Sequence, residues 1–179
     1  MNHNPYSVGE QPTFGDTGMQ GPKFEASVRT MQIIAAALIM GVLSFLGVVL
    51  LATAGRIDGQ PEMITMIAAG FAFLMLVNHF VIPPFIVKAQ LKQSVGSGNH
   101  QKSEEEKILA SCGIYQTQLI VGFALLEGAA FFNLVAMMVE HCVASIAVVT
   151  LLLLVMVAKF PTRDSVSFWV QDKLRELNM

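Results

Sequence analysis

Residues 119–139 read LIVGFALLEGAAFFNLVAMMV, a run of 21 residues with a single charged side chain, Glu127. The hydrocarbon core of a bilayer is ~30 Å thick, and an α-helix needs ~20 residues to cross it. A strand of a membrane barrel would instead alternate apolar and polar residues over about ten positions. The run therefore predicts a transmembrane helix.

Three further apolar runs have the same character. They cover residues 31–54, 63–82 and 143–160, which are 24, 20 and 18 residues long. Inside lipid every backbone N–H and C=O group must be satisfied within the protein, and continuous apolar runs achieve this as helices. The sequence predicts an all-α, polytopic membrane protein with four transmembrane helices.

The composition fits lipid as the solvent. Hydrophobic residues make up 54% of the 179 residues and charged residues only 13%, whereas a soluble domain carries about 25% charged residues. The net charge of -2 argues against nucleic acid as a partner, because nucleic-acid binding needs a dense basic surface. Cys112 and Cys142 lie at opposite ends of one predicted helix, roughly 45 Å apart, so they cannot pair within the chain.

The apolar runs divide the chain into three parts. Residues 1–26 mix proline and glycine without apolar periodicity, which predicts a disordered cytoplasmic tail. Residues 27–160 form the four-helix transmembrane domain. Residues 161–179 form a C-terminal cytoplasmic segment.

Turn and breaker signals separate the helices. Residues 55–62, GRIDGQPE, contain the turn signal Asp58-Gly59, and residues 140–142 make a very tight turn. Pro83-Pro84 is expected to end or kink the second helix. Residues 94–100, SVGSGNH, predict a flexible break.

The third helix has a recognisable start, and a fifth helix follows the fourth. Ser103 and Glu106 fit a capping box, so the third helix is expected to begin near Glu104. Residues 162–177 predict an amphipathic helix with one face formed by Val166, Val170, Leu174 and Leu177, and with Trp169 beside it. Two interpretations stay open: a helix on the membrane surface with its tryptophan at headgroup level, or a cytoplasmic helix packed on the connection between the second and third helices.

Lysine and arginine residues set the expected orientation, because cytoplasmic loops carry an excess of them. Ten of the eleven fall on one side of the predicted membrane: Lys23, Arg29, Lys88, Lys92, Lys102, Lys107, Lys159, Arg163, Lys173 and Arg175. Arg56 alone falls on the other side. We therefore expect the N-terminus, the middle connection and the C-terminus in the cytoplasm.

The first and third helices align with one another at an offset of 87 residues. Seven positions match: Thr30, Ile33, Ala37, Leu38, Gly41, Phe45 and Val48 correspond to Thr117, Ile120, Ala124, Leu125, Gly128, Phe132 and Val135. Five of these pairs fall on one helical stripe. We interpret the alignment as an internal repeat of two tandem helical hairpins; the alternative is chance similarity among apolar residues.

The shared stripe contains small residues four positions apart, Ala37 and Gly41 in one helix and Ala124 and Gly128 in the other. Such pairs let helix backbones approach closely in lipid. We expect the first and third helices to pack through this face, either on each other or on a second copy, with Ala68 and Ala72 of the second helix able to join them. The alternative is that the small residues line lipid.

Glu127 is the one ionisable residue deep in an apolar run, within about two residues, or ~3 Å, of the middle of its helix. A charge there costs at least ~2.5 kcal/mol, so a neutral, hydrogen-bonded acid is expected. Two interpretations stay open: a site for a proton or cation, or a hydrogen bond that holds a neighbouring helix.

His79 is the candidate partner of Glu127. It lies toward the cytoplasmic end of the second helix, roughly 7 Å from Glu127 along the membrane normal, so a proton relay between the two is one possibility. The other is that the imidazole reaches headgroups or a backbone carbonyl. Asn78 and Asn133 are expected to form hydrogen bonds between helices.

No catalytic or metal motif is recognisable. Glu140, His141 and Cys142 have the side chains of metal ligands, but adjacent positions point apart and no second cluster accompanies them. The run Glu104-Glu105-Glu106 suits the start of a helix, where negative charge is favourable. We expect no metal, no cofactor and no enzymatic activity.

One segment resembles a known ion-carrying helix. It consists of Ala124-Leu125-Leu126-Glu127 followed by Phe131, Phe132, Leu134 and Val135. This segment is similar to the carboxylate helix of the rotary ATPase proteolipid (c) subunits, which also runs from the cytoplasm outward and whose acid carries the transported ion. The partner helix of that family has closely spaced glycines, whereas residues 63–82 contain Gly70 alone.

The whole chain resembles small, uncharacterised bacterial four-helix membrane proteins. The similarity lies in the Asn4-Pro5-Tyr6 start, the segment LLEGAAFFNLVAMMVE and the ending KFPTRDSVSFWV. It implies a four-helix fold and a place in the bacterial inner membrane, with no activity attached.

These observations lead to two functional expectations. The first is a non-enzymatic membrane protein of structural or accessory type, surrounded by lipid and associated with a second copy or another membrane protein. The second is a small proton- or cation-coupled carrier, in which Glu127 binds the ion, Phe131 lines its pocket one turn further on, and His79 relays protons.

Overall fold

The computed structural model describes residues 21–54, 56, 59–96 and 103–177. Within these residues the regular structure is α-helical. The helices are α1 (Pro22–Ala52), α2 (Met63–Gly96), α3 (Glu104–Glu140), α4 (Val143–Ala158) and α5 (Arg163–Leu177). The expected fold class, all-α with an amphipathic helix near the C-terminus, is therefore confirmed.

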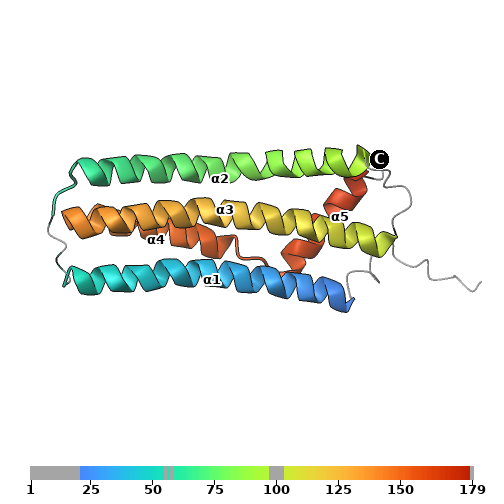
Figure 1. Cartoon of the computed structure of the whole chain (residues 1–179), viewed down its shortest axis with the longest axis horizontal. Helices are drawn as coiled ribbons and strands as arrows, with labels where there is room; N and C mark the ends of the chain where they lie inside the picture. The colour runs from blue at the N-terminus through green and yellow to red at the C-terminus, as the bar shows by residue number, and fades with distance from the viewer. Residues whose placement is uncertain (1–20, 55, 57–58, 97–102, 178–179) are drawn as a thin grey trace, which may run out of the picture.

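The longest helix, α3, occupies the centre of the bundle. It contacts α1, α2, α4 and α5 and lies between α1 and α2 in Figure 1, with α4 behind it. Helices α1 and α2 have no contact with each other among the described residues. The two tandem hairpins that we expected are therefore not confirmed, because α3 lies between the two helices of the first one.

Helix α1 packs through positions that repeat every seven residues. Val28, Ala35, Val42 and Val49 are buried, and Met31 is buried between the first two. A seven-residue repeat is the spacing at which one face of a helix stays against a partner. The small-residue stripe expected to make this contact is displaced from it: Ala37, Ala124 and Gly128 are exposed. Because α1 is apolar on every side, its sequence did not reveal which face meets α3.

Helix α2 meets α3 along small and polar residues. Ala68 and Ala72 are buried there, and the Asn133 side-chain amide donates to the carbonyl oxygen of Ala68 at 3.0 Å. Phe71 and Phe132 pack edge to face with ring centres 5.5 Å apart. The expected hydrogen bond between helices is confirmed for Asn133.

At two of the expected interruptions the helix does not end. Helix α2 continues through Pro83 and Pro84 to Gly96, although prolines remove the N–H groups that would bond the carbonyls of His79 and Phe80. Residues 94–96, expected to begin a flexible break, are the last turn of α2. The rest of that break, most of the N-terminal tail and Asp58 of the expected turn lie outside the described residues.

Three helices, α1, α2 and α3, are long and apolar enough to cross a membrane. Helix α4 has 16 residues, about 24 Å at ~1.5 Å per residue, and so falls short of a full crossing. It meets α5 at an angle of 67°, and the two make a fourth candidate only as one bent span. The described chain thus has three to four candidate spans.

One end of the bundle, called here the α5 end, holds a second apolar cluster. Phe24, Val28 and Met31 of α1 and Ile108 and Cys112 of α3 are buried there against Val166 and Val170 of α5. The apolar face of α5 is thus covered by protein, as in the second of the two interpretations of this helix, with α1 and α3 as the partners. The burial of Phe24 explains why α1 begins at Pro22, within the stretch expected to be disordered up to residue 26.

The opposite end, called here the loop end, contains the expected tight turn. Helix α3 ends at Glu140, His141 takes the left-handed conformation with φ 54°, and α4 begins at Val143. The N–H group of Gly59 donates to the carbonyl oxygen of His141 at 3.3 Å. The connection between α1 and α2 is therefore held against the turn between α3 and α4.

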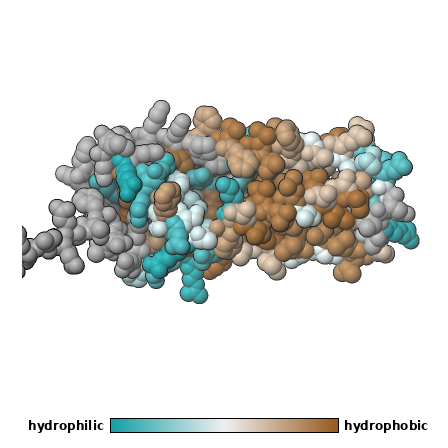
Figure 2. All heavy atoms as spheres, turned by 180° about the vertical axis from the view of Figure 1, so that it is seen from behind, coloured by the Kyte–Doolittle hydropathy of each residue, from teal (hydrophilic) through white to brown (hydrophobic). Residues whose placement is uncertain are grey.

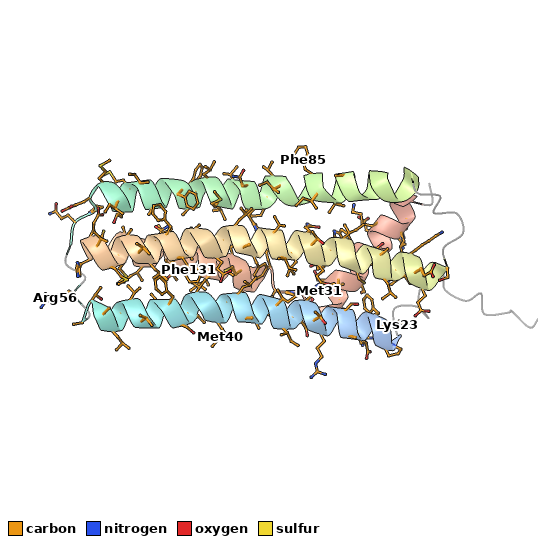
Figure 3. All side chains as sticks on the ribbon, viewed as in Figure 1. Lys23, Met31, Met40, Arg56, Phe85 and Phe131 are labelled. Carbon is orange, nitrogen blue, oxygen red and sulfur yellow. The ribbon has the colours of Figure 1, made fainter. Side chains whose placement is uncertain are left out.

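The surface carries large apolar side chains along the middle of the bundle. Figure 2 shows them as a broad hydrophobic band between hydrophilic groups at the two ends. Met40 points away from the bundle on α1 and Phe85 on α2, while Arg56 and Lys23 lie at opposite ends (Figure 3). Exposed apolar surface of this extent is typical of a protein surrounded by lipid.

Candidate functional site

Glu127 lies on the side of α3 that faces α1. A methyl group added to Gly41 of α1 would lie 3.2 Å from its Oε1 atom. The carboxyl group thus reaches the α1 backbone at a position where a larger residue would push it aside. Its side chain is half-buried, and within the described part of the chain no hydrogen bond is made by its carboxyl group.

A groove of about 550 Å³ opens beside this contact. It is lined by Gly41, Ser44, Phe45 and Val48 of α1 and by Phe131 and Val135 of α3. Phe45 and Phe131 meet edge to face across it with ring centres 5.3 Å apart, and Figure 3 shows Phe131 directed from α3 toward α1. The groove is apolar apart from the Ser44 hydroxyl group.

Exposed small residues accompany the groove on α3. Ala124 and Gly128 are exposed, and a methyl group added to Gly128 would meet no atom within 4 Å. Together with Gly41, these residues and the groove form one surface, called here the α1–α3 face. It presents small residues and an acid to whatever surrounds the bundle.

His79 is buried on the other side of α3. Its Nδ1 atom lies 3.0 Å from the carbonyl oxygen of Gly122, and its ring packs against Phe80 with centres 5.2 Å apart. The imidazole therefore holds α2 to α3, whereas Glu127 reaches α1. His79 thus lies at the contact between α2 and α3 and Glu127 at the contact between α1 and α3, and the described residues show no contact between the two side chains.

A cavity of about 160 Å³ lies next to His79. It is lined by His79 and Phe80 of α2, by Tyr115, Gln118, Leu119, Gly122 and Phe123 of α3, and by Lys159 at the end of α4. The Gln118 Oε1 atom is buried without a hydrogen-bond partner in the described part of the chain. The Lys159 ammonium lies 5.8 Å from the centre of the Phe80 ring.

Glu140 has a role that the sequence did not reveal. Its carboxylate accepts hydrogen bonds from the backbone N–H groups of Glu62, Ile64 and Thr65, at 3.2, 2.7 and 2.8 Å. The last residue of α3 thus caps the first turn of α2, whose N–H groups have no partner within their own helix. No residue near Met63 signals this cap, since its donor and acceptor are more than 70 positions apart.

The hydrogen bonds change the acidity of Glu140, which lies beyond the apolar run that ends at residue 139. Desolvation raises its pKa, and the hydrogen bonds from the start of α2 lower it by more, so the net result is a lowered pKa. A group in this position is a carboxylate at neutral pH. It therefore also places negative charge at the positive end of the α2 dipole.

The described residues contain no group of three or more histidine, cysteine, aspartate or glutamate side chains placed to hold a metal ion. Glu140 is engaged with α2, and His141 and Cys142 belong to the turn between helices. The chemistry that the described part offers thus lies in two places, the α1–α3 face with Glu127 and the cavity beside His79.

Comparison with known proteins identifies no similar protein. No family model matches the chain, and neither the curated proteins nor the solved structures include a match. The resemblance of the Glu127 segment to rotary ATPase proteolipid subunits accordingly has no support. What stands is an all-helical chain with three to four helices able to span a membrane.

Proposed function

We propose that the chain is a non-enzymatic integral membrane protein of structural or accessory type that associates with a second copy of itself. It crosses the bilayer four times, the last time through α4 and the bend after it, with both termini in the cytoplasm. Its polar side chains within the apolar band support this proposal. His79 and Asn133 hold helices together through backbone carbonyls, which is a packing role.

The observation that carries the proposal is the α1–α3 face. Its small residues permit a helix of another molecule to approach closely. Glu127 has no hydrogen-bond partner in its own described chain, and a polar group facing lipid gains free energy by finding one. A second copy offers the exposed Ser44 hydroxyl group of the same face. Two copies related by a twofold axis would present acid to hydroxyl in both directions.

Two glycines of the chain make a matched pair for testing this association. Gly128 lies on the α1–α3 face and Gly70 on the outside of α2; both are exposed, and an added methyl group meets nothing within 4 Å at either position. At both positions the first carbon of a new side chain meets no other part of a single chain, so Gly128→Leu and Gly70→Leu can be compared directly.

The oligomer is measured by energy transfer between labelled copies in lipid nanodiscs or vesicles. We expect Gly128→Leu to reduce association about tenfold or more, the effect of losing roughly 1.4 kcal/mol of contact free energy, and Gly70→Leu to leave it unchanged. Equal behaviour of both variants, or a native chain that stays monomeric at every protein-to-lipid ratio, would refute the proposal.

A second function has one observation in its favour. A proton- or cation-coupled carrier needs a titratable group that an ion can reach, and Glu127 stands half-buried beside a groove with Phe131 one turn further on. Glu127→Gln keeps the hydrogen-bonding capacity of the side chain and removes its titration. If the chain is a carrier, reconstituted vesicles show proton or cation flux that this substitution abolishes; flux that persists unchanged eliminates Glu127 as the carrier group.

A further inference from the structure

The cavity beside His79 lies at one edge of the apolar band. Gln118 directly precedes the apolar run 119–139, and Lys159 directly follows α4. Both residues line the cavity. In a bilayer this position corresponds to the boundary between hydrocarbon and headgroups on the side of α5.

The inner wall of the cavity offers hydrogen-bond acceptors. A carbonyl oxygen can only accept a hydrogen bond, so the Nδ1 atom of His79 carries the hydrogen toward Gly122 O. In the neutral ring the Nε2 atom is then an acceptor. The Gln118 side chain also lines the cavity, and its Oε1 atom is buried without a hydrogen-bond partner in the described chain. A ligand that fills this wall must bring a donor.

The mouth of the cavity offers a cation. The Lys159 ammonium lies over the Phe80 ring, 5.8 Å from its centre, and the lysine side chain is exposed. An ammonium group at the edge of a membrane attracts anionic phosphate. The cavity therefore matches a ligand that has an anionic group and, a few bonds away, an N–H or O–H donor.

The surroundings of the mouth are apolar. Phe80 lines the cavity and is 56% exposed, and α2 and α4 carry further exposed apolar side chains, namely Val77, Val81, Leu154 and Val157. The acyl chains of a lipid would contact these side chains, whereas a small water-soluble phosphate compound would leave them exposed to solvent. This favours a lipid over a soluble ligand.

We propose that this cavity binds the headgroup of a phospholipid whose phosphodiester is followed by a hydrogen-bond donor, as in ethanolamine or glycerol headgroups. The phosphate lies at Lys159, and the ammonium or hydroxyl donor lies against His79 and Gln118. A choline headgroup fits poorly, because its quaternary nitrogen has no N–H group. The inference rests on the membrane location proposed above and is independent of self-association.

The test is native mass spectrometry of the full chain after exchange into a mixture of equal parts ethanolamine, glycerol and choline phospholipids. We expect the native chain to retain ethanolamine or glycerol lipids about tenfold over choline lipids, the effect of one hydrogen bond to the headgroup. Retention in the mixing ratio overturns the proposal. The same spectra report the oligomer, so failure of self-association is read separately.

Two substitutions separate the parts of the site. Gln118→Leu removes the polar amide and leaves a side chain of similar size, so we expect it to abolish the preference over choline lipids. Lys159→Met removes the cation, so we expect it to weaken retention of all three lipids. Gln116→Leu and Lys107→Met, at positions of α3 that do not line the cavity, are the controls and should behave as the native chain. Identical lipid retention in all five proteins contradicts the assignment.

A third arm distinguishes a lipid from a soluble phosphate. Trp169 is the single tryptophan of the chain and packs on Tyr115, which lines the cavity, with ring centres 5.1 Å apart. We expect its fluorescence to change on addition of the ethanolamine lipid and not on addition of free phosphoethanolamine at the same concentration. An equal response to both identifies a site for a soluble phosphate compound and overturns the lipid assignment.

Discussion

Single side chains at the loop end join helices that are distant in the sequence. Glu140 caps the start of α2 from the end of α3, and Gly59 lies directly against the backbone of Glu140 and His141. These contacts tie the connection between α1 and α2 to the turn between α3 and α4. Both residues are thus expected to matter for stability rather than for any reaction.

The cap makes stability depend on pH through Glu140. Its folded-state pKa is lower than the ordinary value of 4.5, so its contribution is fully present above that value and is lost as the pH falls toward the folded-state pKa. We expect Glu140→Gln to lower the melting temperature at neutral pH, and the gap to the native chain to close in acid. Thermal unfolding in detergent between neutral and acidic pH measures this, and a gap that is constant with pH would contradict it.

Gly59 has a matched control in Gly47. A methyl group at Gly59 would overlap the carbonyl oxygen of Glu140, whereas at Gly47 of α1 it meets nothing within 4 Å. We expect Gly59→Ala to lower the melting temperature, and Gly47→Ala to leave it unchanged or raise it, because alanine favours a helix over glycine by up to about 1 kcal/mol. If the two alanines have equal effects, the loop is not held against the turn.

The environment of α5 differs from that of the four apolar helices α1–α4. Val166 and Val170 are buried against α1 and α3, whereas Phe168 of the same helix is 75% exposed. Salt bridges from Lys23 to Glu105 and from Arg163 to Glu25 accompany this packing at 3.1 and 3.4 Å. Since exposed ion pairs contribute little, the apolar contacts hold the helix in place.

The buried face of α5 predicts a difference between two substitutions that lie two residues apart. Val170→Asp buries an unpaired charge and should release α5, whereas Phe168→Asp changes an exposed position and should leave it docked. Limited proteolysis after residue 160, together with the fluorescence of Trp169, reports the release. Release by Phe168→Asp and not by Val170→Asp would show that α5 is held by its other face, as a helix bound to the membrane surface would be.

The helices themselves could be predicted from the sequence, but their partners could not. The four apolar runs, the capping box at Ser103 and the hydrogen bond of Asn133 follow from local patterns, and the structure confirms them as helices and contacts. In lipid, residues that face the solvent are as apolar as residues that face the core. This is why neither the inner face of α1 nor the central place of α3 is visible in the sequence. The cap by Glu140 was missed for another reason, because the N–H groups that it binds are more than 70 positions away.

The whole bundle has an asymmetric charge distribution along its axis. Arg56 lies at the loop end and Lys23 of α1 at the α5 end (Figure 3). The basic residues of α5, namely Arg163, Lys173 and Arg175, also belong to the α5 end. Such asymmetry is the signal by which orientation is set during insertion. The proposed topology thus places the loop end outside the cell and α5 in the cytoplasm.

Labelling of introduced cysteines tests this topology. With the buried Cys112 and Cys142 replaced by alanine, Arg56→Cys should react with an impermeant maleimide in intact cells. Asp172→Cys, on an exposed part of α5, should react only after the cells are opened. Reaction of both cysteines, or of neither, before opening would rule out four crossings with cytoplasmic termini.

The absence of contact between α1 and α2 has a consequence for biosynthesis. The ribosome delivers these two helices first, yet neither provides the other with a surface to dock on. In the proposed membrane topology they remain separate helices until α3 has emerged, and α2 gains its terminal carboxylate only with residue 140. A nascent chain arrested between the second and third helices therefore has no native tertiary structure to retain, and assembly is concentrated in the last part of translation.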